Sequence, residues 1–587
     1  MKSVFLLCLG IVTMGMCQAQ IIVSPEHEHI LYTGRFSFAD PEEPSFSMNG
    51  ASIQVNFDGT EIKGHFSVRG GNSFLYVIID GQADPYNRQV LEISGISEAS
   101  YVIATGLPPG LHTLELIKLN ESGSTINFYG LEIQGAGLTT KPQRPAIQLE
   151  FIGDSNTAGW AAWDAYDNGS SKTSGAYFTF PGITSRLLNA EYSLVGGSGS
   201  GIQDRTSWNL TKHYGRIHLR DPQTPQNTWN FADNYWEFQP EAVVVNLGAN
   251  DYYAGTSKLE IKEGWKSFIQ HQLRVHYPEA HIVLANSYGW AYNEPADYVH
   301  EAIEELHRDG ERNVSYLRFP WLWGQSHAVI NEHAGFANLL ASHLARELNL
   351  GEIALSELSS FVSAGEIYNG SFEKSILPGI ADGWRPHGGF ELVLDESEAL
   401  DGRKCVLLKE GGWLNFATEV NTGDSLLLSA WAKAAEDSHS GLIKIEFKDQ
   451  AQKTIQTQQL QPDFNTAWQE FRVSAVVPDG VWSAWLVLSA EATSTIYFDL
   501  VSLKSVSSLT MPPQWPSEEI RLYPNPSNQF VNIHPDLDVD LVEVYRLNGE
   551  VIHPTVEENK IDVRDWQSGI YMIRIREENF VAKIVVF

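Results

Sequence analysis

The feature that most restricts the fold is a regular alternation of short apolar runs with amphipathic helical patterns between residues 147 and 350. Strands that are apolar on both faces and are separated by helices form parallel sheets covered by helices on both sides. The alternation therefore predicts an α/β/α domain over residues 145–352. The apolar runs are 147–152, 242–247 and 280–285, and the helical patterns are 258–275, 296–307 and 334–348.

The sequence on both sides of this domain predicts only strands. Residues 21–140 alternate apolar and polar positions between turns such as Asp58-Gly59, which predicts a β-sandwich. Residues 365–506 predict a second β-sandwich. Residues 519–587, which follow a proline-rich linker, predict a small β domain. A chain of 587 residues has room for about four such domains.

The N-terminus has the pattern of a secretory signal peptide. A lysine at position 2 precedes an apolar run over residues 4–16, and Ala19 is the expected cleavage site. Cys17 would suit a lipoprotein, but Met16 before it is larger than the small residue that such sites use. Only Cys405 then remains in the mature chain. We therefore expect each domain to be stabilised by its own core and not by disulfides, and no transmembrane segment in the mature chain.

The charge balance excludes one class of partner. The chain has 40 Lys and Arg against 72 Asp and Glu, a net charge of −32. Nucleic acid binding depends on a basic surface that neutralises phosphates. We therefore expect no nucleic-acid partner, and neutral ligands stay open.

Polar residues follow the predicted parallel strands in an order that favours nucleophilic catalysis. Ser155 ends the first strand in Gly153-Asp154-Ser155, and parallel strands place such residues at the ligand-binding edge of the sheet. A serine nucleophile needs a base and an oxyanion hole. Gly199 follows the next strand, Asn250 follows the strongest strand, and His327 lies before the last helix. Taken one at a time, each of these four residues is also consistent with a role in a turn or in packing.

The four segments that carry Ser155, Gly199, Asn250 and His327 resemble the four sequence blocks of the SGNH (GDSL-type) hydrolases. Over residues 28–350 the chain resembles carbohydrate esterase family 2 more closely. The resemblance implies a jelly roll before the hydrolase, and deacetylation of xylan, glucomannan or related polysaccharides. It implies Ser155 as nucleophile and His327 as general base. It also implies an oxyanion hole formed by the backbone N–H groups of Ser155 and Gly199 and by the Asn250 amide. The matching motifs lie at residues 32–36, 56–60, 107–113, 116–121, 153–155 and 229–231.

Two departures from this family concern the base. Gln325 stands where an Asp usually precedes the histidine by two residues, and a neutral amide cannot stabilise an imidazolium as a carboxylate does. We therefore expect a Ser–His dyad, oriented by a backbone carbonyl or by Gln325. Glu332-His333 offers a rival base. The Gly-x-x-His spacing from Gly324 favours His327.

Tryptophan is unevenly distributed. There is none in residues 21–140, nine in the α/β domain and six in residues 365–506. Sugars stack on aromatic rings, although most tryptophans pack in cores. The four nearest to the predicted nucleophile and base are expected to line the substrate cleft: Trp160, Trp163, Trp321 and Trp323.

Residues 365–506 resemble jelly-roll carbohydrate-binding modules. The resemblance is carried by 369–373 (Asn-Gly-Ser-Phe-Glu), Trp384 and 497–503. It implies a glycan ligand and a structural calcium ion within 365–506. For catalysis by Ser155 and His327 we expect neither a cofactor nor a metal ion.

The C-terminal residues resemble the sorting domain of the type IX secretion system, through 522–526, 544–549 and 568–571. This implies export by that machinery in a Gram-negative bacterium, followed by release or attachment to the cell surface.

Together these features predict a secreted carbohydrate O-acetylesterase that acts on acetylated plant polysaccharide through a Ser-His acyl-enzyme mechanism. One alternative is an SGNH esterase with another acyl substrate. Another is a glycan-binding protein whose esterase centre is degenerate, as Gln325 suggests.

Overall fold

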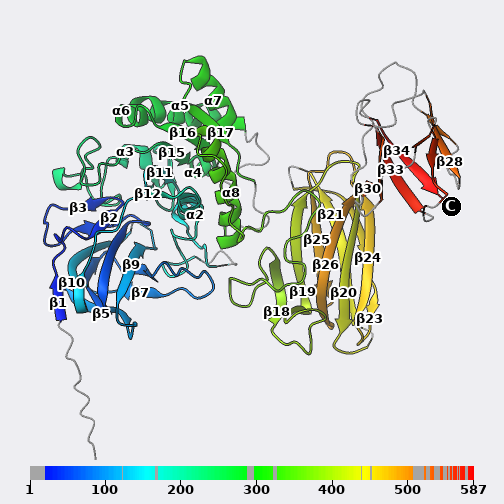
Figure 1. The fold of residues 1–587 in the computed structure, drawn as a ribbon, viewed down its shortest axis with the longest axis horizontal. Helices are drawn as coiled ribbons and strands as arrows, with labels where there is room; N and C mark the ends of the chain where they lie inside the picture. Colours follow the sequence, from blue (N-terminus) through cyan, green and yellow to red (C-terminus); the bar gives the residue numbers. More distant parts are fainter. Residues whose placement is uncertain are drawn as a thin grey trace, which may run out of the picture. The chain divides into compact units, whose positions relative to one another are not determined.

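The structure is a computed structural model that describes residues 20–506, apart from 122, 165–168, 287–296, 321–326, 438 and 450–451, and parts of 521–586. The chain divides into two compact units, one up to residue 505 and one from 506 to 587. Figure 1 shows three successive parts in the first unit, which we call the N-terminal sandwich, the α/β domain and the third domain.

The N-terminal sandwich is built around one long strand. β5 pairs antiparallel with β10 on one edge and with β9 on the other, and its inward side chains, including Phe57 and Phe66, are fully buried. The strands are β1 (Gln20–Val23), β2 (Leu31–Thr33), β3 (Phe36–Ser37), β4 (Ser45–Phe46), β5 (Ser52–Arg69), β6 (Ser73–Ile79), β7 (Val90–Ile93), β8 (Ala99–Thr105), β9 (Leu111–Lys118) and β10 (Thr125–Leu138).

The α/β domain contains the predicted parallel sheet, in the order β12-β11-β15-β16-β17. Alternate residues of the strands enter two separate cores. Val243 and Val245 pack with the side chains of α5 and α7, while Val244 packs with those of α2 and α8. Helices therefore cover both faces, as the apolar strands predict. The strands are β11 (Ile147–Gly153), β12 (Ala190–Gly196), β15 (Ala242–Asn246), β16 (His281–Ala285) and β17 (Val314–Leu317), with a separate pair β13 (Ser200–Gly201) and β14 (Trp208–Asn209).

The helices agree with the sequence patterns, except that a π turn at Ile269–Leu273 interrupts the pattern over 258–275 and the last helix begins earlier. It starts at Ile330 because Glu332 at its third position accepts the N–H of Val329 and closes the first turn. The helices are α1 (Ser155–Ala158), α2 (Phe180–Leu187), α3 (Leu210–His213), α4 (Ala249–Tyr253), α5 (Lys258–Phe268), α6 (Arg274–His276), α7 (Asp297–Arg308) and α8 (Ile330–Glu347), with the 3₁₀ turn η1 (Pro225–Asn227) and the π turn η2 (Ile269–Leu273).

The third domain has nine antiparallel strands around one core that includes the fully buried Trp384. Its strand β19 pairs with β25 along its second half and with β26 along its first. The strands are β18 (Arg385–Val393), β19 (Cys405–Glu419), β20 (Ser425–Ala434), β21 (His439–Lys448), β22 (Thr454–Leu460), β23 (Asp463–Phe464), β24 (Gln469–Val476), β25 (Ser483–Ala490) and β26 (Thr495–Val506).

The second unit contains two four-stranded sheets with a small core that includes Val531, Val544 and Ile584. Its strands are β27 (Arg521–Tyr523), β28 (Phe530–His534), β29 (Val542–Arg546), β30 (Val551–Ile552), β31 (Val556–Glu557), β32 (Lys560–Asp562), β33 (Gly569–Ile575) and β34 (Phe580–Val586). Among the helices described here, none is long and apolar enough to cross a membrane.

Candidate active site

Ser155 and His327 meet at the carboxyl ends of the parallel strands. Ser155 begins α1 directly after β11, and its Oγ lies 2.9 Å from Nε2 of His327. Asp154 caps this short helix because its carboxylate accepts the N–H of Asn156 at 2.9 Å. Since a hydroxyl and an imidazole at this distance can exchange a proton, the pair has the geometry of an activated nucleophile.

The other two predicted blocks follow the strands on either side of β11. Gly153 at the end of β11 pairs with Gly196 at the end of β12 and with Asn246 at the end of β15. The segments that carry Gly199 and Asn250 therefore emerge beside Ser155.

Hydrogen bonds join these two segments. The Asn250 amide donates to the carbonyl of Ser200 at 2.9 Å. The buried carboxylate of Asp251 accepts the N–H groups of Ile202 and Gln203 at 2.8–3.1 Å. Asp251 was not predicted from the sequence as a site residue, although it directly follows Asn250. It holds the loop after Gly199 against α4.

The two candidate bases lie in different environments. His333 is fully buried in α8, its Nδ1 accepts the N–H of Phe180 at 3.4 Å, and burial lowers its pKa to about 3. Its ring stacks on that of Phe180. The structure therefore brings His327 to Ser155 and places His333 in the core. Gln325, the candidate orienter, lies outside the described residues.

The four tryptophans expected in the cleft are only partly described. Trp163 is half-buried, with the guanidinium of Arg88 3.6 Å from its ring centroid and with Val329, Leu377 and Ile380 packed around it. Trp160 is half-buried, and its backbone N–H donates to the carbonyl of Ser155 at 2.9 Å. Trp321 and Trp323 lie outside the described residues. Contact with a sugar stays a prediction for all four.

The third domain contacts the segment that carries His327. Arg385 at the start of β18 forms a buried ion pair with Glu332 of α8, whose carboxylate also accepts the N–H of Val329 at 3.0 Å. Val329 is two residues from His327. One carboxylate thus connects the third domain to the helix that follows the candidate base.

No group of three or more His, Cys, Asp and Glu side chains in the described part of the chain is arranged to hold a metal ion. Two acidic side chains of the third domain bond to backbone N–H groups. Glu373 accepts those of Arg403 and Lys404 at 2.7 Å, and Asp499 accepts those of Leu400 and Asp401 at 2.9 and 3.1 Å. The calcium ion implied by the resemblance stays a prediction.

Three family models match this chain in succession. Residues 32–142 match the carbohydrate esterase 2 N-terminal domain, and residues 151–351 match the GDSL-like lipase/acylhydrolase family. Residues 521–587 match the secretion system C-terminal sorting domain, which indicates export through a secretion system. The resemblances stated for the first two domains and for the tail are confirmed, whereas the resemblance of residues 365–506 to a carbohydrate-binding module stays a prediction.

Curated relatives agree with the first two of these matches. The chain is 29% identical over 336 residues to the cellulase/esterase CelE of Acetivibrio thermocellus, covering 54% of this chain and 39% of the relative. It is 25% identical over 353 residues to the acetylxylan esterase / glucomannan deacetylase of Cellvibrio japonicus, covering 56% of this chain and 89% of the relative. The chain therefore spans well under half of the first relative and most of the second.

Solved structures share the fold of the same region. A family two carbohydrate esterase from Cellvibrio japonicus aligns at 21% identity with a TM-score of 0.50. An acetyl xylan esterase from the rumen bacterium Butyrivibrio proteoclasticus aligns at 22% identity with the same score. Each alignment covers 57% of this chain and 99% of the other, so the shared fold is that of the N-terminal sandwich and the α/β domain.

Proposed function

We propose that the protein is an exported esterase that removes acetyl groups from the hydroxyls of a plant polysaccharide of the xylan or glucomannan type. The observation that carries this proposal is the 2.9 Å contact between Ser155 Oγ and His327 Nε2 at the carboxyl ends of the parallel strands. The match of residues 32–142 to the N-terminal domain of carbohydrate esterase 2 supports a carbohydrate ester as the substrate.

The reaction is a two-step acyl transfer. His327 takes the proton of Ser155 as Oγ attacks the acetyl carbonyl, and the backbone N–H groups of Ser155 and Gly199 and the Asn250 amide stabilise the oxyanion. The imidazolium then protonates the departing sugar oxygen, which leaves an acetyl-serine. In the second step His327 deprotonates a water molecule that attacks this ester. Acetate leaves and Ser155 regains its proton.

We further propose that Ser155 and His327 act as a dyad. The family's usual Asp is replaced by Gln325, which carries no charge to stabilise the imidazolium. A backbone carbonyl, or Gln325 itself, then orients the imidazole ring.

The third domain supplies a second surface suited to sugars. Trp413 on β19 and Trp485 on β25 line a cavity of about 440 Å³ together with Lys444, Glu446 and Lys448 of β21. The Trp413 ring stacks on the imidazole of His387, and the Lys448 ammonium lies 4.0 Å from the Trp485 ring centroid. The part of these half-buried indoles that stays accessible, beside polar side chains, is suited to stacking and hydrogen bonding with a sugar ring. We propose that this groove holds the polysaccharide during deacetylation.

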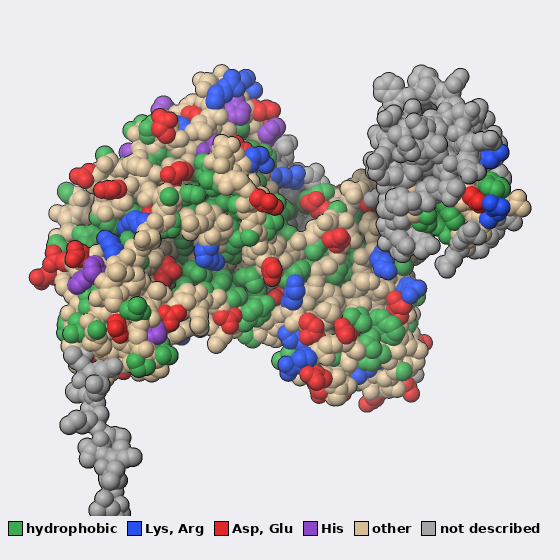
Figure 2. All heavy atoms as spheres, in the orientation of Figure 1, with side chains coloured by type: hydrophobic (Ala, Val, Ile, Leu, Met, Phe, Trp, Pro, Cys, Tyr) green, Lys and Arg blue, Asp and Glu red, His purple; other side chains and the backbone are tan. Residues whose placement is uncertain are grey.

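A neutral polysaccharide also suits the surface charge. Figure 2 shows Asp and Glu side chains spread over the visible face, interspersed with Lys and Arg. The net charge of −32 repels polyanions but not uncharged glycans. The sorting domain would bring the enzyme to such substrates outside the cell, either released or attached to the surface.

The test is release of acetate from a panel of acetylated polysaccharides, together with hydrolysis of a chromogenic acetate ester, by the wild type and by Ser155→Ala. Release from at least one glycan by the wild type alone supports the proposal. Hydrolysis of the small ester without any glycan would favour a different acyl substrate. Glycan binding without hydrolysis of any ester would favour a binding protein with a degenerate centre.

The groove is tested in the inactive Ser155→Ala background by retention on insoluble polysaccharide. Trp413→Ala with Trp485→Ala should abolish retention. Trp468→Ala, which changes a tryptophan of the same domain outside the groove, is the matched control and should retain binding.

A further inference from the structure

We propose that Glu121 and Arg220 are positioning residues that orient the N–H of Gly199 toward the oxyanion. This inference rests on the proposed esterase function. It assigns a role in the reaction to the N-terminal sandwich, which supplies Glu121.

Ser198 is held on both sides of its backbone. Glu121 accepts its N–H at 3.0 Å and its hydroxyl at 2.6 Å, using a different carboxylate oxygen for each. Arg220 donates to the carbonyl of Ser198 at 2.7 Å. All three hydrogen-bonding groups of Ser198 therefore have partners. Glu121 of the sandwich bonds its N–H and its hydroxyl, and Arg220 of the α/β domain bonds its carbonyl.

The bond from Arg220 determines the direction of the next N–H. The carbonyl of Ser198 and the N–H of Gly199 belong to the same peptide unit, which is planar and trans, so the two groups point in opposite directions. A donor that holds the carbonyl oxygen therefore turns the N–H of Gly199 away from itself. Gly199 has a φ of +73°, and a Cβ there would lie 3.0 Å from Cβ of Ser207, so the position favours glycine.

The sandwich holds Glu121 rigidly. The fully buried Lys118 donates to the carbonyls of Asn120 and Glu121 at 2.7 and 2.9 Å. The Asn120 side chain accepts the Ser73 hydroxyl and the Phe74 N–H at 2.9 and 3.0 Å. This buried network holds the backbone that follows β9 at Asn120 and Glu121, and from there the Glu121 carboxylate reaches Ser198.

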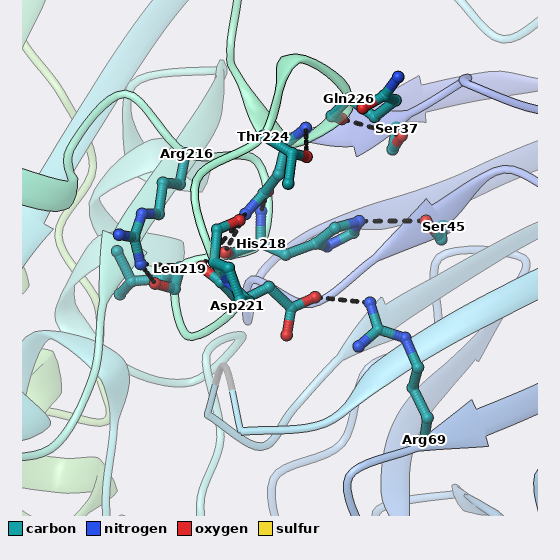
Figure 3. Close-up of polar contacts among 11 residues, drawn as sticks. Ser37, Ser45, Arg69, Arg216, His218, Leu219, Asp221, Thr224 and Gln226 are labelled. Atoms are coloured by element: carbon teal, nitrogen blue, oxygen red, sulfur yellow. Dashed lines mark hydrogen bonds and ion pairs between the residues drawn. The ribbon is translucent and has the colours of Figure 1, made fainter.

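The loop that carries Arg220 is attached to the same sandwich. Asp221 pairs with Arg69 at 2.5 Å, and His218 is hydrogen-bonded to the Ser45 hydroxyl at 3.1 Å (Figure 3). The segments that carry Glu121 and Arg220 are thus both bonded to the sheet of the N-terminal sandwich. The opposite charges of Glu121 and Arg220 attract each other, which favours holding the peptide between them.

The experiment compares Glu121→Ala and Glu121→Gln with the wild type in the full chain. The matched control is Arg144→Gln, which removes another ion pair to the α/β domain, with Glu191 near the start of β12, far along that strand from Ser198. We expect kcat on a chromogenic acetate ester to fall at least about tenfold in Glu121→Ala and less in Glu121→Gln, with KM within threefold. Phosphonylation of Ser155 by a fluorophosphonate, in which Oγ displaces fluoride, should slow in parallel, because its pentacoordinate transition state also develops negative charge on an oxygen that the oxyanion donors bind.

Amide hydrogen exchange of the segment 196–203 gives a readout that does not depend on activity. It should accelerate in Glu121→Ala and stay unchanged in Arg144→Gln. The inference is overturned if kcat stays within threefold of the wild type, if KM rises as much as kcat falls, or if exchange does not change. A wild type that hydrolyses no ester would refute the proposed function, and the exchange experiment would still decide whether Glu121 orders this peptide.

Discussion

Replacing Arg385 by Met should destabilise the first unit more than a typical surface substitution. The ion pair between Arg385 and Glu332 is buried, with side-chain exposures of 8% and 10%. Removing one partner of such a pair leaves an uncompensated buried charge, which costs about 3–5 kcal/mol. Glu332 keeps one hydrogen bond, from the N–H of Val329 at 3.0 Å, so we expect about 3 kcal/mol at pH 7.

The loss should depend on pH with a defined sign. Burial raises the pKa of Glu332, and Arg385 opposes that rise. Without Arg385 the pKa rises further, so the folded state binds a proton more readily than the unfolded state does. The free energy of unfolding of the variant then falls as pH increases. The difference from the wild type should be largest near neutral pH and smaller near pH 5.

The assay is urea unfolding of the full chain, followed by tryptophan fluorescence at both pH values. Arg472→Met is the control, because its pair with Glu470 on β24 is accessible to solvent and should contribute little to the free energy of unfolding. Adding Glu332→Gln to Arg385→Met removes the unpaired charge and should recover more than half of the loss. A loss below 1 kcal/mol at pH 7, or one that is equal at both pH values, would refute the reasoning.

Three further predictions concern the site and the tail. Ser155→Ala and His327→Ala should each lower kcat by at least about a thousandfold, while Gln325→Ala should stay within threefold; a large loss in all three would refute the dyad. His333→Gln should keep kcat within threefold. Because burial depresses the pKa of His333 to about 3, the wild type loses stability as pH falls below the unfolded value of about 6.5, and His333→Gln should unfold at a lower pH in an acid titration. Truncation at Pro513 should leave the protein in the periplasm, as measured by cell fractionation, and normal export would contradict the role of the tail.

The sequence predicted the parts of the site that depend on local pattern. A buried strand ending in Gly153 places Ser155 at the sheet edge, and strand order alone brings the segments of Gly199 and Asn250 beside it. The sequence left His327 and His333 as rivals, because the two lie close together in the chain. Burial separates them, since α8 begins at Ile330 and directs His333 into the core.

Contacts between domains could not be predicted in this way. Glu121 and Ser198 are 77 residues apart, and Glu332 and Arg385 are 53 apart. Each is a single polar residue without periodicity, so only the packed domains reveal its partner. The packing of Trp163 against Arg88 and Ile380 is likewise a long-range contact without a sequence signal, and its contact with a sugar stays a prediction.

The packing of the third domain bears on how the proposed groove and the proposed active site would act together on a polymer. Leu377 and Ile380 form one apolar cluster with Val329 and Trp163, and Ile376 joins another with Tyr76 of the sandwich. The domain that carries the groove of Trp413 and Trp485 therefore packs directly against the α/β domain and the N-terminal sandwich and is not connected to them by a linker alone. An enzyme held by that groove would deacetylate at a constant number of sugar units from its grip, and the products of a single binding event would carry that spacing.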